Sequence, residues 1–254
     1  MKSSDDGTPL LRVGILRTDR VLEGLQATHG DYPDMFAALL SDPALSEDLP
    51  DPPKLMLSAY DVQQGEFPAA TACEAYVVTG SRHSVYDDMP WIAALVAFLR
   101  EALAARRTVV GICFGHQLIA HYFGGETRAA DSGWCVGVHR AQVLEQEAWM
   151  QPPRPAFNLL SSHRDQAVRL PAAARRFAAS AACPNAGFVM EVEGGGRVLT
   201  FQGHPEFSKP YARELMATRR DALGEERLAA GMDSLQEPLD NAVVARWILN
   251  FLSS

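Results

Sequence analysis

Short runs of aliphatic and β-branched residues alternate, in the first half of the chain, with stretches whose apolar positions recur at helical spacing. Helical spacing is clearest over 34–40 and from Pro90 to Leu103, and Asp87 or Asp88 is predicted to cap the second of these helices. This alternation predicts an α/β fold with a mostly parallel central sheet and helices on both faces. The apolar runs predict four strands, at 11–16, 54–60, 75–79 and 108–112.

The second half of the chain has a different pattern. Residues 136–144 alternate in the manner of a strand. Two β-rich runs, at 188–193 and 197–202, are joined by three glycines, which predicts a small antiparallel hairpin. Residues 208–254 return to a helical pattern, and no internal repeat or low-complexity segment is present. We therefore predict a single domain over 1–254, with a core at about 11–207 and a C-terminal helical extension at about 208–254.

Charge and composition narrow the possible functions. Asp and Glu number 31 against 23 Lys and Arg, a formal net charge of -8, so we do not expect a general nucleic-acid partner. The longest apolar-leaning stretch, 91–99, is too short to span a membrane, and the first residues lack the apolar run of a secretory signal. The four cysteines form neither a CxxC pair nor a disulfide framework. These features predict a cytoplasmic protein with free thiols.

Cys113 lies in the most informative segment, Gly-Ile-Cys-Phe-Gly-His-Gln at 111–117, where a buried strand is predicted to end and a helix to begin. A nucleophile in such a turn projects from the chain, and flanking glycines leave room for the turn to pack. The amino end of a helix also favours a thiolate. The alternative is a buried core cysteine, which is the usual fate of an isolated thiol and our interpretation of the other three. For Cys113 the setting favours a nucleophile.

His204 and Glu206 follow the predicted strand that ends at Gln202, within Gly-His-Pro-Glu at 203–206. A histidine can act as the base for a thiol, and a nearby carboxylate can fix its tautomer. By themselves the two residues are equally consistent with a surface turn at a strand end. Together with Cys113 they form a candidate Cys-His-Glu triad.

These motifs together resemble the class I, triad-type glutamine amidotransferases over about Leu11 to Phe207. Segment 111–117 is similar to the family's nucleophile elbow, and 203–206 to its His-Glu pair. Thr79-Gly80-Ser81 is similar to its oxyanion loop, and 159–165 (Leu-Leu-Ser-Ser-His-Arg-Asp) to its substrate-contacting segment. The resemblance implies the flavodoxin-like α/β fold of that family.

The resemblance also implies a chemistry: Cys113 attacks the γ-carbonyl carbon of a glutamyl amide, His204 transfers the proton, and Glu206 holds His204. The expected product of this first half-reaction is a γ-glutamyl thioester. The implied oxyanion hole consists of Gly80, Ser81 and the main chain of Phe114. The residues implied to hold a small γ-glutamyl substrate are Gln117, Ser162, His163, Arg164 and Asp165.

Two positions depart from the family pattern. Gly80-Ser81-Arg82 stands where many members have Gly-Gly-Pro, and Arg164 stands where glycine is usual. The segments 79–91 and 30–36 are instead similar to a stand-alone subgroup that includes plant γ-glutamyl peptidases. A cation at Arg164 could pair with the carboxylate of a longer γ-glutamyl peptide.

Other polar features are given no catalytic role. His116 and His121 are five residues apart on a predicted helix and cannot share a face, so no metal site is expected. No phosphate-binding glycine loop is present, and no cofactor is expected. The pairs Arg175-Arg176 and Arg219-Arg220 are interpreted as solvated surface.

Three hypotheses remain open from the sequence. The first is a self-sufficient enzyme that cleaves a γ-glutamyl amide bond. The second is a glutaminase subunit that delivers ammonia to a separate synthetase partner, and the third is a non-catalytic binding protein of the same fold. The filled triad positions count against the third hypothesis. The helical extension at 208–254 and the absence of an acceptor-activating domain favour the first over the second.

Overall fold

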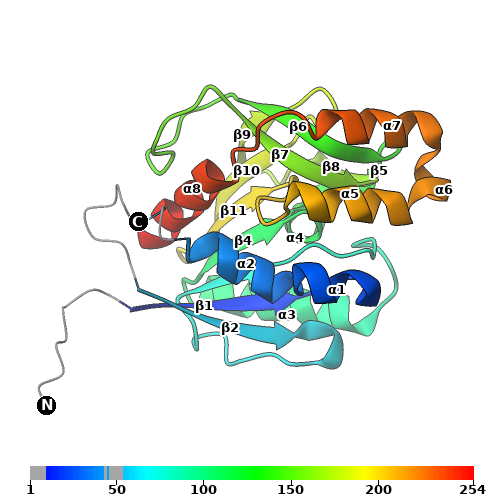
Figure 1. Cartoon of the computed structure of the whole chain (residues 1–254). Coiled ribbons are helices and arrows are strands. Elements are labelled where there is room, and N and C mark those ends of the chain that lie inside the picture. Colours follow the sequence, from blue (N-terminus) through cyan, green and yellow to red (C-terminus); the bar gives the residue numbers. More distant parts are fainter. Residues whose placement is uncertain (1–9, 43–44, 46–53) are drawn as a thin grey trace, which may run out of the picture.

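The computed structural model of the chain describes residues 10–42, 45 and 54–254. The residues preceding 10, on which the expectation of no secretory signal mainly rests, lie outside this range. Within the described part, one sheet carries nine strands in the order β2-β1-β3-β4-β11-β10-β9-β6-β7, and a second sheet pairs β5 with β8 (Figure 1). The strands are β1 (Leu10–Arg17), β2 (Lys54–Asp61), β3 (Ala75–Val78), β4 (Thr108–Ile112), β5 (Glu126–Ala129), β6 (Cys135–Val143), β7 (Ala156–His163), β8 (Asp165–Arg169), β9 (Ala174–Ala179), β10 (Gly187–Glu191) and β11 (Arg197–Phe201).

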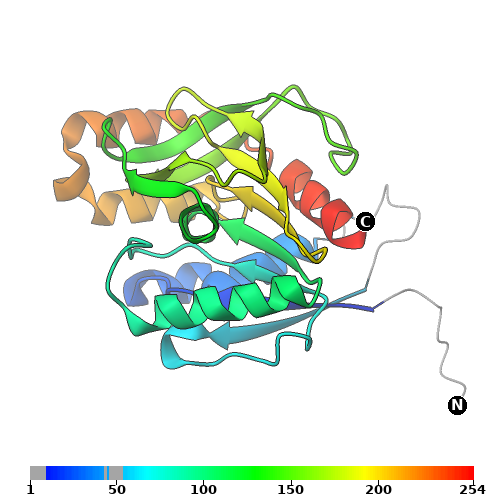
Figure 2. The ribbon, with the colours of Figure 1, turned by 180° about the vertical axis from the view of Figure 1, so that it is seen from behind.

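Helices cover both faces of this large sheet. The first two helices lie on the face turned to the viewer in Figure 1, and the third lies on the opposite face, seen from behind in Figure 2. No helix of the described residues is long and apolar enough to cross a membrane. The α-helices are α1 (Glu23–His29), α2 (Tyr32–Leu40), α3 (Pro90–Ala104), α4 (Phe114–Tyr122), α5 (Lys209–Thr218), α6 (Arg220–Leu223), α7 (Glu225–Ser234) and α8 (Asn241–Ser253).

The predicted fold class is confirmed. Strands β2, β1, β3 and β4 run parallel to one another, as the alternation of the first half predicts, and β11 adds a fifth parallel strand beside β4. The predicted hairpin is the antiparallel pair β10 and β11. The antiparallel portion is larger than that hairpin, because β9, β6 and β7 extend the same sheet beyond β10. Strand β11 therefore joins the two portions, because it pairs parallel with β4 on one side and antiparallel with β10 on the other.

Strand β4 is buried along its whole length, as its continuous apolar run predicts. Val110 and Ile112 pack into the cluster beneath α2 and α8, whereas Val109 packs into the cluster beneath α3 and α4. The predicted cap of α3 is wrong: Met89 is the N-cap residue and makes no side-chain capping bond. The Asp87 carboxylate instead accepts a hydrogen bond from the Ser84 main chain at 3.0 Å, which fixes the loop before the helix.

Helix α8 closes the core from the carboxyl end of the chain. Trp247 is fully buried, and its ring packs edge-on against Trp149 and Phe157. Its indole N–H donates to the Pro152 carbonyl oxygen at 2.9 Å, so the polar atom of this large side chain is satisfied. The end of the chain is thus part of the hydrophobic cluster that supports β4 and β11.

Candidate active site

Cys113 occupies the turn between β4 and α4, where the main chain is strained. Its φ of 51° and ψ of -96° lie in a region that residues with a side chain rarely adopt. A Cβ placed on Gly111 would lie 2.7 Å from the Gly115 main chain, and one on Gly115 would lie 2.6 Å from the Val78 carbonyl oxygen. Both glycines are therefore required for the strand and the helix to approach each other. The predicted elbow is present, and its tight packing holds the cysteine in this conformation.

Gly80 brings the loop after β3 against the elbow. A Cβ on Gly80 would lie 3.7 Å from Cβ of Cys113 and 2.8 Å from Cε1 of His204. Phe114 is the first residue of α4, where main-chain N–H groups have no partner within the helix. Gly80 and the Phe114 main chain therefore both lie next to Cys113.

His204 and Glu206 form a buried pair in the segment that follows β11. His204 Nδ1 lies 2.7 Å from Glu206 Oε1, and the two side chains are 4% and 0% exposed. The Phe207 ring stacks on the imidazole with centroids 3.8 Å apart and planes 9° apart. The His204 main-chain N–H donates to the Leu160 carbonyl oxygen at 2.8 Å. The imidazole is therefore fixed by a carboxylate, an aromatic ring and its own main chain.

The surroundings of His204 favour its charged form. Burial alone would lower the pKa of His204, but the Glu206 charge and the charge and hydrogen bond of Cys113 outweigh burial and raise the pKa to about 10. The imidazole therefore carries a proton at neutral pH, with Nδ1 directed at Glu206. The second nitrogen, Nε2, is left to interact with the thiol.

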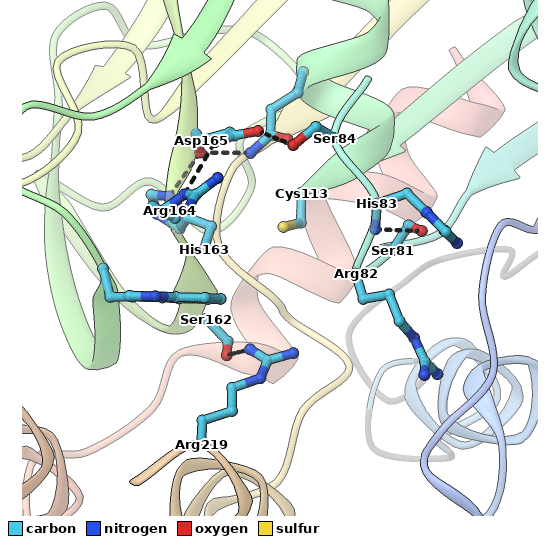
Figure 3. A pocket seen from close by; sticks show the side chains of 12 residues that line it. Ser81, Arg82, His83, Ser84, Cys113, Ser162, His163, Arg164, Asp165 and Arg219 are labelled. Atoms are coloured by element: carbon cyan, nitrogen blue, oxygen red, sulfur yellow. Dashed lines mark hydrogen bonds and ion pairs between the residues drawn. The ribbon is translucent and has the colours of Figure 1, made fainter. Parts of the chain in front are cut away.

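The pocket beside Cys113 has a volume of about 330 Å³, within the range of small-molecule sites (Figure 3). Seven of the eleven predicted site residues line this pocket, whereas Gly80, Phe114, His204 and Glu206 are not among its lining residues. The lining residues are Ser81, Arg82, His83, Ser84, Cys113, Gln117, Trp134, Ser162, His163, Arg164, Asp165 and Arg219.

Asp165 is the buried carboxylate of this pocket. Its Oδ2 accepts a hydrogen bond from the Ser84 hydroxyl at 2.5 Å, while Oδ1 accepts none and lies 3.7 Å from Arg164 Nε. The Gln117 amide donates to the Asp165 main-chain oxygen at 2.7 Å, which fixes the start of β8. Burial lowers the pKa of His163 to about 3, so this histidine is neutral and cannot supply a charge. Oδ1 is therefore a buried carboxylate oxygen that accepts no hydrogen bond and has the Arg164 guanidinium as its cationic neighbour.

The described residues contain no group of three or more His, Cys, Asp or Glu side chains that could hold a metal ion. The other three cysteines are buried and free, as predicted. Burial raises the pKa of Cys73, and it raises the pKa of Cys135 and of Cys183 to about 12. These three thiols are therefore kept protonated at neutral pH.

The family model described as Glutamine amidotransferase class-I matches residues 59–219, a stretch that includes the elbow, the pocket and the His-Glu pair. The chain belongs to this family. It is 29% identical to a glutamine amidotransferase-like protein of Schizosaccharomyces pombe, over 94% of this chain and 98% of the relative. It is also 29% identical to gamma-glutamyl peptidase 4 of Arabidopsis thaliana, over 74% of this chain and 72% of the relative.

A shorter match is to a subunit of a synthetase. Over 52% of its length the chain is 33% identical to one subunit of the glutamine-hydrolysing GMP synthase from Sulfolobus acidocaldarius, and 67% of that subunit is covered. Among solved structures, a glutamine amidotransferase of Thermotoga maritima superposes with a TM-score of 0.73 at 17% identity. That alignment covers 96% of this chain and 99% of the other, and it confirms the predicted fold.

Several residues in or near the pocket were not predicted from the sequence. Ser84 and Trp134 are examples. Gln202 was not predicted either; it is not a lining residue, but its amide lies 3.5 Å from the Cys113 sulfur. The interpretation of Arg219 as solvated surface is wrong, because this half-buried side chain lines the pocket and donates to the Ser162 hydroxyl at 2.6 Å. No local pattern distinguishes Arg219 from its exposed neighbour, since its position depends on how α5 and α6 pack.

Arg82, which stands where many family members have proline, adds no free charge to the pocket. Its main-chain N–H and its Nε both donate to Asp19 Oδ2, each at 2.8 Å. The terminal nitrogen donates to the Arg20 carbonyl oxygen at 2.9 Å. These bonds tie the loop after β3 to the end of β1, so the loop next to Gly80 is held in place by a buried carboxylate.

Proposed function

We propose that this amidotransferase cleaves a γ-glutamyl amide bond through a γ-glutamyl thioester on Cys113. The observation that carries the proposal is the buried His204–Glu206 pair, 2.7 Å apart, beside a cysteine held at a strained strand-to-helix turn. A protonated imidazole next to a cysteine stabilises the thiolate, which is the nucleophilic form. The chemistry needs a free thiol, so we place the reaction in a reducing compartment, the cytoplasm.

In the first half-reaction, the Cys113 thiolate attacks the γ-carbonyl carbon of the substrate. The carbonyl oxygen becomes an oxyanion that the Phe114 main-chain N–H and an N–H of the Gly80-Ser81 turn would bind. His204 donates its Nε2 proton to the departing nitrogen, the C–N bond breaks, and an amine or ammonia leaves. The γ-glutamyl group remains on the sulfur as a thioester, and His204 is neutral.

In the second half-reaction, neutral His204 accepts a proton from water, and the hydroxide equivalent attacks the thioester carbon. Collapse of this intermediate breaks the C–S bond and releases glutamate. The thiolate and the protonated imidazole are restored together. Glu206 stabilises the positive charge that His204 carries before and after each cycle.

The glutamyl group would be held at the Asp165 side of the pocket. Asp165 Oδ1 is buried and lacks a hydrogen bond, so it would bind the α-ammonium group. Gln117, His163 and Arg164 lie around it and would complete the site for the α-amino and α-carboxylate groups. Among γ-glutamyl compounds, we expect dipeptides and thiol conjugates to be preferred over free glutamine.

The alternative is an ammonia-delivering component of a separate synthetase, which the match to a GMP synthase subunit favours. Turnover by the isolated protein distinguishes the two functions. The purified chain should be assayed on a panel of γ-glutamyl compounds with ammonia and glutamate both measured, with Cys113→Ala as the control. We expect cleavage by the isolated protein. Cleavage only after addition of a cell extract or a synthetase would support the ammonia-delivering role, and binding without cleavage under any condition would support a non-catalytic protein.

A further inference from the structure

Arg219 is the cation of the pocket that has no carboxylate partner. Arg82 is paired with Asp19 at 2.8 Å, and Arg164 lies 3.7 Å from Asp165. Among the described residues, no carboxylate oxygen lies within ion-pair distance of Arg219; its polar partner is the neutral Ser162 hydroxyl at 2.6 Å. A half-buried guanidinium with an unbalanced charge attracts an anionic ligand.

The surroundings of Arg219 fix its orientation. It is the residue between α5 and α6, and its guanidinium carbon lies 5.1 Å from the centre of the Trp134 ring. The indole covers one side of the guanidinium, and Ser162 accepts from Nη1. Because the guanidinium stacks on the Trp134 ring and one of its nitrogens is hydrogen-bonded to Ser162, its orientation is already fixed. It can therefore bind a carboxylate with little loss of side-chain entropy.

Arg219 lies on the opposite side of the nucleophile from the proposed glutamyl site. In Figure 3, Asp165 and Ser84 lie at one end of the pocket and Arg219 lies at the other, with Cys113 between the two ends. A substrate whose α-amino group is held at Asp165 and whose γ-carbon reaches Cys113 therefore directs its leaving group toward Arg219.

We propose that Arg219, anchored by Trp134 and Ser162, binds the carboxylate on the leaving-group side of the substrate. This inference rests on the proposed function and names the substrate class: γ-glutamyl-α-amino acids with a free carboxylate beyond the scissile bond. Free glutamine has no such group. Arg164 is less suited to this role, because it lies beside Asp165 at the glutamyl end and its side chain is 54% exposed.

The test compares γ-glutamylglycine with γ-glutamylglycinamide, which differ only in the charge of the terminal group. In the wild type we expect kcat/KM for the acid to exceed that for the amide by about ten- to a hundredfold, the usual size of a hydrogen bond to a charged group. Arg219→Met and Arg219→Gln should bring this ratio to about one. Because the ratio is measured within each variant, a reduced folded fraction lowers both rates equally and leaves the ratio intact.

Arg220→Met is the matched control, because Arg220 is the next residue but pairs with Glu225 at 2.6 Å on the exposed surface. This variant should keep the wild-type ratio. An unchanged ratio in both Arg219 variants would overturn the proposal. A ratio lost in Arg164→Met but kept in Arg219→Met would also overturn it and would assign the carboxylate to Arg164.

Binding measurements separate this inference from the proposed cleavage. In the Cys113→Ala background, calorimetry should show γ-glutamylglycine binding about ten- to a hundredfold more weakly once Arg219→Met is added, with the amide unaffected. If the wild type cleaves neither compound but this difference in binding is found, the cleavage proposal fails and the carboxylate site stands. If both compounds are cleaved and Arg219→Met changes neither binding nor the ratio, the carboxylate site fails.

Discussion

Replacing Glu206 with glutamine isolates the effect of the carboxylate charge on His204. The glutamine Oε1 can still accept from Nδ1, so the ring can keep its orientation, but the negative charge is lost. Two unit charges about 4 Å apart interact by about 4 kcal/mol at the effective dielectric constant of roughly 20 that suits protein sites. At about 1.4 kcal/mol per unit of pKa, that loss lowers the His204 pKa by about 3, from the wild-type value of about 10.

The assay is an NMR titration of the histidine ring resonances, with His204 assigned from the spectrum of His204→Ala. The wild-type ring should remain protonated through neutral pH, and the Glu206→Gln ring should lose its proton near neutral pH. Because the folded-state pKa is raised above the ordinary value of 6.5, the stabilisation from this proton is fully present below pH 6.5 and is lost as pH rises toward about 10. In Glu206→Gln the His204 pKa is expected to lie only slightly above 6.5. The stabilisation from the proton should therefore be smaller than in the wild type and should already be lost just above pH 6.5.

Glu214→Gln is the matched control, because Glu214 lies 3.3 Å from His29 but is 47% exposed. Solvent screens such a pair, so this variant should leave the His204 titration unchanged. A Glu206→Gln protein whose His204 still titrates near pH 10 would refute the argument that the Glu206 charge holds the proton. A wild-type His204 that titrates near 6.5 would refute it as well.

Three further changes test the site. His204→Ala should reduce thioester formation more severely than Glu206→Gln, because it removes the proton carrier itself; pre-steady-state rates of the two variants check this order, and the reverse order would exchange the assigned roles. Gly80→Ala should lower kcat/KM by roughly ten- to a hundredfold, because the new methyl group would lie 2.8 Å from the His204 ring and displace it, whereas Gly24→Ala, with nothing within 4 Å, should leave activity unchanged. Equal activity of the two alanine variants would mean that the close approach at Gly80 is not needed. Iodoacetamide near pH 7 should modify Cys113 much faster than the other three buried thiols, as peptide mass mapping can show, and equal labelling of all four would contradict its role.

The fold could be predicted largely because its signals are local. The continuous apolar run 108–112 predicts a strand buried on both faces, and the structure buries all of β4. The glycines at 194–196 likewise predict the β10–β11 hairpin. The extent of the antiparallel portion could not be predicted in this way, because β6 pairs with both β7 and β9 across long stretches of sequence. Pairings of that kind depend on tertiary packing, which a local pattern does not contain.

Pocket residues also differ in whether a local pattern could place them. The positions of Cys113 and His204 at one edge of the sheet could be predicted, because each lies within three residues of the end of a strand and β4 and β11 are adjacent and parallel. Arg219 could not, because nothing near it in the sequence marks it off from Arg220. Its place in the pocket depends on contacts with Ser162 and Trp134, which are separated from it by more than fifty residues.

Trapping the covalent intermediate tests the central claim most directly. The purified protein should be mixed with a γ-glutamyl substrate, quenched in acid during turnover, digested and examined by mass spectrometry. The account predicts a γ-glutamyl group on the peptide that carries Cys113, none on the peptides of the other cysteines, and neither adduct nor turnover in Cys113→Ala. Sustained turnover by a correctly folded Cys113→Ala protein, or an adduct on another residue that forms and decays at the catalytic rate, would contradict it.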